Sequence, residues 1–218
     1  MTFKLAVKTL AQRNGLHATF MPKPIFGIAG SGMHTNMSLF RNGKNAFYDP
    51  DDPRGLSKEA YSFIAGLLAH VKGMAAVTNP LVNSYKRLVP GYEAPCYLAW
   101  SASNRSALIR IPASRGQGTR VELRSPDPSC NPYLAFTVIL AAALEGIAQE
   151  TPLPPALTET GQLPRDLGEA IVLAEQSDFL RETLPQAMLE KYLAEKRRLW
   201  ERFQGDPKTV FAQHLRAI

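Results

Sequence analysis

Residues 120–124 of the chain, Arg-Val-Glu-Leu-Arg, alternate charged and apolar side chains. Successive side chains of a β-strand point to opposite faces, so this segment predicts a strand with one charged and one apolar face. The common interpretation of such a charged face is a solvated surface with weak ion pairs. The alternative is a functional role for a carboxylate held between two guanidinium groups, and the alternation alone does not choose between them.

A second alternating segment, Met33–Phe40, places His34, Asn36 and Ser38 on one face and apolar residues on the other. It predicts a second strand with a polar face, followed by a hairpin turn at Arg41–Asn45. Further short strands are predicted at His17–Lys23, Cys96–Trp100 and Ala107–Ile111. Residues Asn79–Ala94 show little periodicity and are predicted to form a long loop.

Two helix starts are marked by capping residues. Ser57 is a typical N-cap for a helix from Lys58 to about Ala75, and Asn131 followed by Pro132 begins a helix that ends at about Gln149. The second helix is apolar nearly all round, which predicts a central and buried position. Other helices are predicted at Thr2–Asn14, Asp166–Glu175, Gln186–Gln204 and from Thr209. Because most strands precede most helices, we expect an α+β fold: an antiparallel sheet packed with helices, then a helical C-terminal region.

The basic residues are unevenly distributed along the 218-residue chain, which has a net charge of +6. No acidic residue precedes Asp49, and residues 86–124 contain seven Arg or Lys but only two Glu. A nucleic-acid partner is not expected, since neither stacking aromatics nor a recognition helix is evident. Arginines separated by apolar strand residues instead favour a pocket for phosphates and carboxylates.

Several features bear on the location of the protein in the cell. No run of 18 apolar residues indicates a membrane span, and the N-terminal segment lacks the apolar core of a signal peptide. The two cysteines, Cys96 and Cys130, have no metal-binding spacing and form no disulfide framework. We therefore expect a cytoplasmic protein.

Taken singly, the candidate functional residues have ordinary structural explanations. A histidine such as His34 is more often hydrogen-bonded than a ligand, and isolated arginines are often surface charges. The loop Gly27–Gly32 lacks the Gly-Lys-Ser/Thr ending of a phosphate-binding loop. The segment from Asn83 to Pro112 is less ordinary, because it places arginines at close intervals among Gly, Pro, Asn and Tyr residues.

Four segments together carry a resemblance: GSGMHTNMSLF, NSYKRLVPGYEAP, NRSALIRIP and RVELRSPDPSCNPYLAF. In this order they resemble the signature segments of bacterial type I glutamine synthetase, and the likeness runs from about residue 2 to the C-terminus. The resemblance implies that residues 1–150 are the C-terminal part of the catalytic domain, with the active-site strands and flap. Residues 151–218 would form a helical segment of the same domain. The small N-terminal β-grasp domain of the family would be absent.

The resemblance implies an ATP-dependent amide ligase that makes glutamine from glutamate and ammonium through γ-glutamyl phosphate, with Mg²⁺ or Mn²⁺ ions. By motif position, His34 and Glu122 are the metal ligands, and the residues for ATP are Asn36, Ser38, Arg110 and Arg120. Glutamate would be held by Gly30, Arg87 and Arg124. Arg105 would stabilise the transferred phosphoryl group, and Glu93, on a mobile flap, would take a proton from ammonium.

The sequence also departs from the family pattern. Ala29 stands where many members have an asparagine that touches glutamate, and the connector after Pro152 is shorter than usual. Family members are about twice as long, and their remaining metal-binding glutamates lie in the part that is missing here, so we expect a truncation at Met1 and no activity of the chain alone. Full-length members are expected to form dodecamers.

Two alternatives stay open. The chain is either part of a γ-glutamyl ligase for another amine or a non-catalytic binding or regulatory relative. The acidic residue in the segment PGYEAP favours ammonium as the amine.

Overall fold

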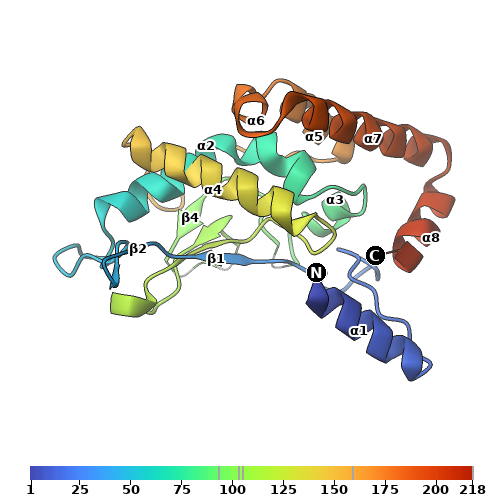
Figure 1. The fold of residues 1–218 in the computed structure, drawn as a ribbon, viewed down its shortest axis with the longest axis horizontal. Coiled ribbons are helices and arrows are strands. Elements are labelled where there is room, and N and C mark those ends of the chain that lie inside the picture. Colours follow the sequence, from blue (N-terminus) through green and yellow to red (C-terminus); the bar gives the residue numbers. More distant parts are fainter. Residues whose placement is uncertain (93, 103, 105, 159, 218) are drawn as a thin grey trace.

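The computed structural model describes residues 1–92, 94–102, 104, 106–158 and 160–217. A small sheet lies on one side of two long helices, and three further helices lie on the other side of that pair (Figure 1). The predicted α+β class is confirmed.

The four-stranded sheet consists of β1 (Thr35–Met37), β4 (Trp100–Ser101), β5 (Ile109–Arg110) and β6 (Val121–Leu123), in the order β1-β6-β5-β4. The pairs β1–β6 and β5–β6 are antiparallel, whereas β4 and β5 are parallel. The prediction of a wholly antiparallel sheet is therefore wrong for this last pair. Strands of two residues carry too little pattern for the direction of pairing to be inferred from sequence.

The predicted hairpin is confirmed. β2 (Phe40–Arg41) pairs with β3 (Lys44–Asn45) across a two-residue turn in which Asn42 and Gly43 have φ angles of 53° and 76°. Positive φ at both central residues is what a tight hairpin turn requires, and Asn-Gly is the pair that adopts it most readily.

The predicted strand at His17–Lys23 is wrong, since these residues are irregular. Lys23 shows why. Its backbone N–H donates to Oδ1 of Asn83 at 2.7 Å, and its carbonyl accepts from Nδ2 of Asn83 at 2.9 Å. The side-chain amide of Asn83 thus makes the hydrogen bonds to the Lys23 backbone that a neighbouring strand would otherwise make. Asn83 precedes the short helix α3 (Ser84–Arg87), which interrupts the segment predicted as a continuous loop.

The two central helices are α2 (Lys58–Thr78) and α4 (Pro132–Ala148), and each begins at its predicted cap. Ser57 accepts from the backbone N–H of Ala60, and Asn131 accepts from those of Tyr133 and Leu134. The helices cross at two glycines. A Cβ on Gly66 would lie 2.2 Å from the carbonyl oxygen of Ala142 and 2.8 Å from Cα of Gly146, so the backbones approach too closely for any side chain there.

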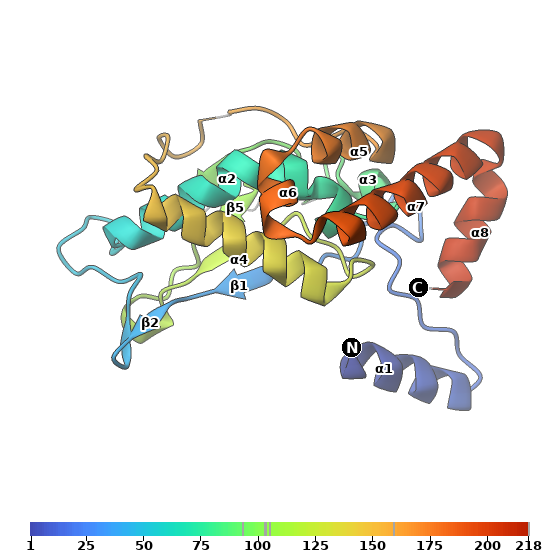
Figure 2. The ribbon, with the colours of Figure 1, turned by 45° about the horizontal axis from the view of Figure 1, so that its top comes forward.

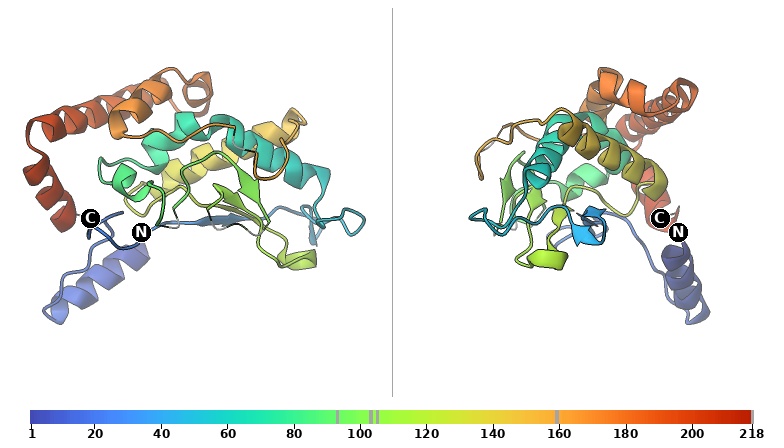
Figure 3. Two further views of the ribbon diagram at one scale, coloured as in Figure 1. Left: turned by 180° about the vertical axis from the view of Figure 1, so that it is seen from behind. Right: turned by 60° about the vertical axis from the view of Figure 1, so that its left-hand side comes forward.

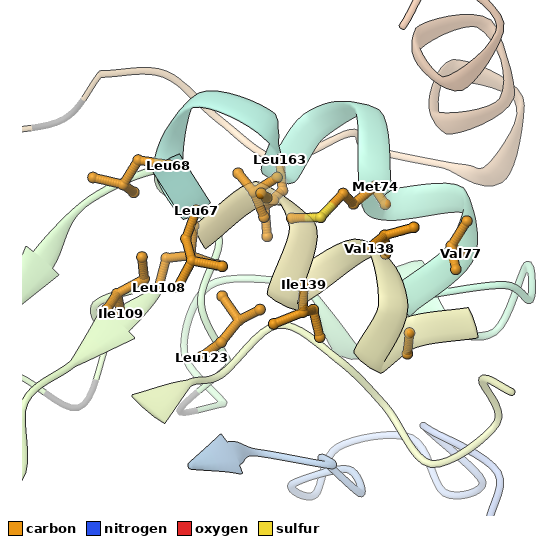
Figure 4. Close-up of a cluster of buried hydrophobic side chains, with 14 of the residues drawn as sticks. Leu67, Leu68, Met74, Val77, Leu108, Ile109, Leu123, Val138, Ile139 and Leu163 are labelled. Carbon is orange, nitrogen blue, oxygen red and sulfur yellow. The ribbon is translucent and has the colours of Figure 1, made fainter. Parts of the chain in front are cut away.

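The hydrophobic core lies between these two helices and the sheet (Figure 4). Leu67 of α2, Ile139 of α4 and Leu123 of β6 are each fully buried and converge there. The apolar face of β6 thus faces the helices, and its charged face is turned away from them. This arrangement decides on which side of the sheet a polar site can form.

The prediction that the helix from Pro132 to about Gln149 is central and buried holds for one side of the helix only. The side of α4 that faces the core is buried, but an apolar stripe on another side is 42–71% exposed, consisting of Tyr133, Phe136, Leu140 and Leu144. A helix that is apolar nearly all round has no polar face from which its exposed side can be recognised, so sequence reasoning had no signal for this stripe.

The remaining helices are α1 (Thr2–Arg13), α5 (Leu167–Glu175), α6 (Asp178–Thr183), α7 (Gln186–Gly205) and α8 (Pro207–Ala217), with a 3₁₀ turn, η1, at Gly116–Gly118. Figure 2 shows α5, α6 and α7 over α2 and α4, and Figure 3 shows α1 projecting from the rest of the chain. The helices predicted in the C-terminal third are present, and α6 is an addition to them.

One helix, α2, is long and apolar enough to cross a membrane by length and composition. However, 67% of its most apolar window is buried inside the fold, in contact with α4 and α5. The apolar character of α2 is therefore accounted for by its place in the core.

Candidate active site

Three neighbouring strands place one polar residue each in a single row. In the register of the sheet, Asn36 of β1 lies opposite Glu122 of β6, and Glu122 lies opposite Arg110 of β5. Residues directly opposite each other share a face of the sheet, so the three side chains lie together on the face turned away from the helices. This register brings the polar faces of the alternating segments 33–40 and 120–124 onto one face of the sheet.

Glu122 is the centre of the charged cluster. Its Oε1 lies 3.4 Å from Nδ1 of His34, and its Oε2 lies 2.6 Å from Nε of Arg110 and 3.5 Å from Nη1 of Arg124. The contact with Arg110 is an ion pair rather than an aligned hydrogen bond. Glu122 and Arg124 are each only 4% exposed, so the solvated-surface interpretation of this strand is wrong. Burying a carboxylate costs free energy that only close pairing with cations can offset. Buried clusters of charged groups are therefore common at functional sites.

His34 lies just before β1 at the edge of this cluster, and its side chain is 33% exposed. Burial and the nearby charges of Arg124 and Arg87 lower its pKa, and these effects outweigh the opposing effect of Glu122. The imidazole is therefore predominantly neutral at pH 7, as a metal-ligating histidine must be.

A cavity of about 140 Å³ opens next to His34. Its lining comes from the glycine-containing loop, from α3, from the segment after α3 and from the end of β6, and consists of Ala29, Gly30, Gly32, His34, Arg87, Tyr92, Ala94 and Arg124. The absence of a side chain at Gly30 and Gly32 allows neighbouring groups to approach the cavity closely. A Cβ on Gly30 would lie 2.2 Å from the carbonyl oxygen of Pro22, and one on Gly32 would lie 2.5 Å from Nη2 of Arg87.

Arg87 reaches the cavity from the end of α3 although it is only 3% exposed. Its Nη1 donates to the carbonyl of Ser125 at 2.7 Å, and its Nη2 donates to the carbonyl of Arg124 at 3.0 Å. Burial lowers the pKa of Arg87, but a guanidinium stays charged in proteins. A fixed, desolvated guanidinium beside a cavity is suited to binding a carboxylate or a phosphate.

The outer part of the row is more exposed. Nε of Arg120 donates to Oδ1 of Asn36 at 3.2 Å, so these two predicted ATP residues contact each other. Ser38 follows β1 on the same polar, exposed side of the alternating segment as His34 and Asn36. The structure thus brings nine residues around one face and one cavity: the two metal candidates, three of the four ATP candidates, the three glutamate candidates and Tyr92.

The two predicted catalytic residues, Glu93 and Arg105, lie outside the described residues. Tyr92 and Ala94 both line the cavity, and the ring centroid of Tyr92 lies 3.6 Å from Nζ of Lys23. The backbone N–H of Ser106 donates to Oδ1 of Asn104 at 2.8 Å.

Metal binding can be tested against the donors that are present. His34 and Glu122 offer a nitrogen and an oxygen that converge at 3.4 Å, which fits two ligands of one divalent cation. The described residues contain no group of three or more His, Cys, Asp or Glu side chains that could hold a metal ion. A hard divalent cation takes about six ligands, so the pair fits part of a site, and other donors must complete it.

Sequence reasoning missed three contributors to this site: Lys23, Tyr92 and Asp127. Lys23 and Tyr92 stack on each other, and Asp127 organises the turn that follows β6. Lys23 and Asp127 lie in irregular segments, where periodicity carries no information, and only their burial marks them.

Comparison with known proteins agrees with this geometry. Residues 1–214 match the family model described as "Glutamine synthetase, catalytic domain". Glutamine synthetase of Clostridium saccharobutylicum is 57% identical over 219 aligned residues, and that of Thermotoga maritima is 54% identical over 217. These alignments cover 94% and 93% of this chain but 49% of each relative. The chain therefore spans about half the length of the curated relatives it matches.

Solved structures show the same similarity. One titled "Apo GmaS without ligand" superposes with a TM-score of 0.84 at 38% sequence identity, over 94% of this chain and 49% of that one. A second structure of the same name, a complex with ADP, has the same TM-score and identity. The match to the family model along nearly the whole chain and the identity to the curated relatives show that the chain belongs to the glutamine synthetase catalytic domain family.

Proposed function

We propose that this chain provides the glutamate- and nucleotide-binding part of an ATP-dependent ligase that makes glutamine from glutamate and ammonium. The observation that carries the proposal is the row Asn36–Glu122–Arg110, which adjoins a cavity lined by His34, Arg87 and Arg124. Such a site offers fixed cations for carboxylate and phosphate oxygens and a nitrogen–oxygen pair for a divalent cation.

The substrate roles follow from position in the site. Arg87 and Arg124, with the backbone of Gly30, bind glutamate in the cavity, because these groups lie at its wall. Asn36, Ser38, Arg110 and Arg120 bind ATP along the exposed face of the sheet. The structural neighbour named GmaS was solved with ADP, which supports a nucleotide as one ligand of this fold.

The proposed reaction proceeds in two steps. An oxygen of the glutamate side-chain carboxylate attacks the γ-phosphorus of ATP, and the bond to ADP breaks. Ammonia then attacks the carbonyl carbon of γ-glutamyl phosphate, and phosphate leaves. Arg105 stabilises the charge on the transferred phosphoryl oxygens, and Glu93 accepts the proton that ammonium releases.

Mg²⁺ or Mn²⁺, held in part by His34 and Glu122, would neutralise charge on the phosphoryl oxygens when bound. The contribution of the chain itself is to hold these two donors together and to keep Oε2 of Glu122 engaged by Arg110 and Arg124. Oε1 is then the oxygen oriented toward His34 and toward a cation.

The chain by itself is proposed to bind its ligands without turnover. In the part of the chain that the structure describes, no third His, Cys, Asp or Glu side chain joins His34 and Glu122, and two donors cannot hold the two or three cations expected for the family. The protein is proposed to act in the cytoplasm as part of a homo-oligomer. Free thiols at Cys96 and Cys130 are compatible with a reducing compartment.

The first test measures ligand binding to the 218-residue chain by titration calorimetry with ADP and Mg²⁺, and separately with L-glutamate. We expect Arg120→Ala to weaken ADP binding and to leave glutamate binding unchanged, and Arg87→Ala to do the opposite. Arg165→Ala is the control, since the Arg165 side chain is 85% exposed and pairs with Glu169, and Arg165 is not one of the proposed binding residues. If the chain binds neither ligand, the proposal fails for this chain.

The second test measures phosphate release with ATP, glutamate, ammonium and Mg²⁺. The chain alone should show no ammonium-dependent turnover. Addition of the part of the Clostridium saccharobutylicum enzyme that this chain does not cover should restore it, because binding of a complementary folded part is linked to completion of the site. Turnover that requires an alkylamine and not ammonium would instead favour a γ-glutamyl ligase for another amine. Binding without turnover in any mixture would favour a non-catalytic relative.

A further inference from the structure

One contributor to the site, the buried carboxylate of Asp127, does not line the cavity itself. It is 0% exposed and lies in the turn between β6 and α4. Its Oδ1 accepts hydrogen bonds from the backbone N–H of Ser129 at 3.0 Å and from the hydroxyl of Ser129, and its Oδ2 accepts from Nδ2 of Asn79 at 3.0 Å. Such a group is costly to bury, and full hydrogen bonding offsets that cost.

Asp127 also holds the helix that carries Arg87. The hydroxyl of Ser84, the first residue of α3, accepts from the backbone N–H of Leu81 at 3.1 Å. Burial raises the pKa of the Asp127 carboxyl, and the Ser84 hydroxyl, which lies near it, lowers that pKa. Arg87 is the last residue of the same four-residue helix. The start of α3, the helix that carries Arg87, therefore lies beside the Asp127 carboxylate.

The acceptors of the Arg87 guanidinium are tied to Asp127 as well. Arg87 donates to the carbonyls of Arg124 and Ser125, which precede Asp127 in the same turn. Asn79 connects the two parts, because its Nδ2 donates both to Oδ2 of Asp127 and to the carbonyl of Ser125 at 2.8 Å. Asp127 is thus linked through Asn79 to the Ser125 carbonyl that accepts from the Arg87 guanidinium, and it also lies beside the start of the helix that carries the Arg87 backbone.

The charges of the two groups are complementary. Arg87 is 3% exposed, and its pKa is lowered first by burial, while the charge of Asp127 opposes this and that of Arg124 adds to it. The negative charge of Asp127 favours the protonated guanidinium and raises the pKa of Arg87 against the effect of burial. A negative charge across the Ser125 carbonyl therefore offsets part of the cost of burying Arg87 beside Arg124.

We propose that Asp127 is a positioning residue for Arg87: it fixes α3 and the turn after β6 so that a charged guanidinium faces the cavity in a geometry ready for a carboxylate. The inference rests on the proposed function in that the carboxylate is taken to be that of glutamate. Asp127 does not touch the cavity and acts only through Arg87. Its loss should therefore affect glutamate binding and spare nucleotide binding, which takes place on the other side of Glu122.

The test compares Asp127→Asn with the parent chain. Asparagine has the same shape but lacks the charge, and its amide group would face the amide of Asn79, donor against donor. We expect L-glutamate to bind about tenfold more weakly or worse, since a hydrogen bond to a charged group contributes enough for such a factor. ADP binding should be unchanged. The NMR signals of the Arg87 guanidinium should exchange with water faster, because its acceptors are no longer held.

Two further variants separate a positioning role from a general structural role. Asp51→Asn makes the same chemical change on an exposed carboxylate and should alter none of these quantities. Ser84→Ala keeps the charge of Asp127 and removes only its hold on α3, so it should weaken glutamate binding less than Asp127→Asn does. Circular dichroism establishes that each variant is folded before binding is measured.

The outcomes are distinct. Equal weakening of glutamate and ADP binding by Asp127→Asn would show a general structural role and overturn the proposal, as would unchanged glutamate binding with unchanged exchange at Arg87. If the parent chain binds no glutamate, the proposed function fails, and the exchange of the Arg87 protons alone decides the role of Asp127. Unchanged exchange overturns the positioning role in that case also.

Discussion

Nδ1 of His34 lies 3.4 Å from Oε1 of Glu122, although the two residues come from opposite ends of the sheet-forming part of the sequence. The antiparallel pairing of β1 with β6 produces this contact, because it aligns the polar faces of two alternating segments. The two side chains therefore converge on one side of the sheet. Their role as metal ligands stays a prediction.

Glu122→Gln should destabilise the fold. The change removes the buried negative charge that Arg110 and Arg124 contact, and loss of one partner from a buried ionic group costs about 3 kcal/mol. Urea unfolding measures the difference. Glu169→Gln is the matched control, since Glu169 pairs with Arg165, whose side chain is 85% exposed, and exposed pairs contribute less than about 1 kcal/mol. Equal losses for the two variants would contradict the central place of Glu122.

Gly66→Ala should destabilise the core at the crossing of α2 and α4. The added Cβ would lie 2.2 Å from the carbonyl oxygen of Ala142, and neither helix backbone can move without disturbing the packing beneath it. Overpacking of this kind costs about 1–3 kcal/mol or more, measurable by urea unfolding. Gly205→Ala makes the same change at the end of α7 where a Cβ meets nothing within 4 Å, and should leave stability nearly unchanged.

Gly32→Ala should impair the cavity more than the fold. Its Cβ would lie 2.5 Å from Nη2 of Arg87 and 3.0 Å from Nε2 of His34, both of which are ends of side chains that can shift. We expect weaker glutamate binding in calorimetry with little change in the unfolding midpoint. Gly30→Ala should behave differently, because its Cβ would meet the backbone carbonyl of Pro22 at 2.2 Å, and so it should also lower stability. A loss of stability that is as large for Gly32→Ala would argue against this distinction.

Acid should weaken the packing of α8 through His214. Burial lowers the pKa of this histidine below its usual value of 6.5, and the nearby cations Lys196 and Arg202 lower it further. Lys86 and Lys208 line a surface groove together with His214 and are also cationic. The unfolded chain therefore binds the proton more tightly than the folded one, and stability is lost as the pH falls through 6.5 toward the lower value of the folded state.

The measurement is the thermal midpoint at pH 5.5 and at pH 7.5, chosen about one unit either side of the ordinary histidine pKa. His214→Gln removes the proton-binding group, so its loss of stability between the two pH values should be smaller than that of the parent chain. His17→Gln is the control, since His17 is exposed and only its Nε2 contacts the carbonyl of Leu215. An identical pH dependence for parent and His214→Gln would contradict the assignment.

Much of the local structure follows directly from the order of residues. The caps at Ser57 and Asn131 and the turn at Asn42–Gly43 act through hydrogen bonds and φ angles within a few residues, so a pattern in the sequence suffices to predict them. The alternation in segments 33–40 and 120–124 likewise determined which side chains share a face. The family resemblance then pointed to the residues of the site, most of which the fold brings together.

Only the tertiary structure decided which of those faces would be buried, and beside what. The same alternation in 120–124 is compatible with a solvated surface, and it is the pairing of β6 between β1 and β5 that leaves Glu122 4% exposed among three cationic or basic side chains. The parallel direction of β4, the exposed apolar stripe of α4 and the hold of Asp127 on Arg87 were likewise invisible in sequence. The physical reason is the same in each case: local patterns specify periodicity and capping, whereas burial and pairing arise from contacts between segments far apart in the chain.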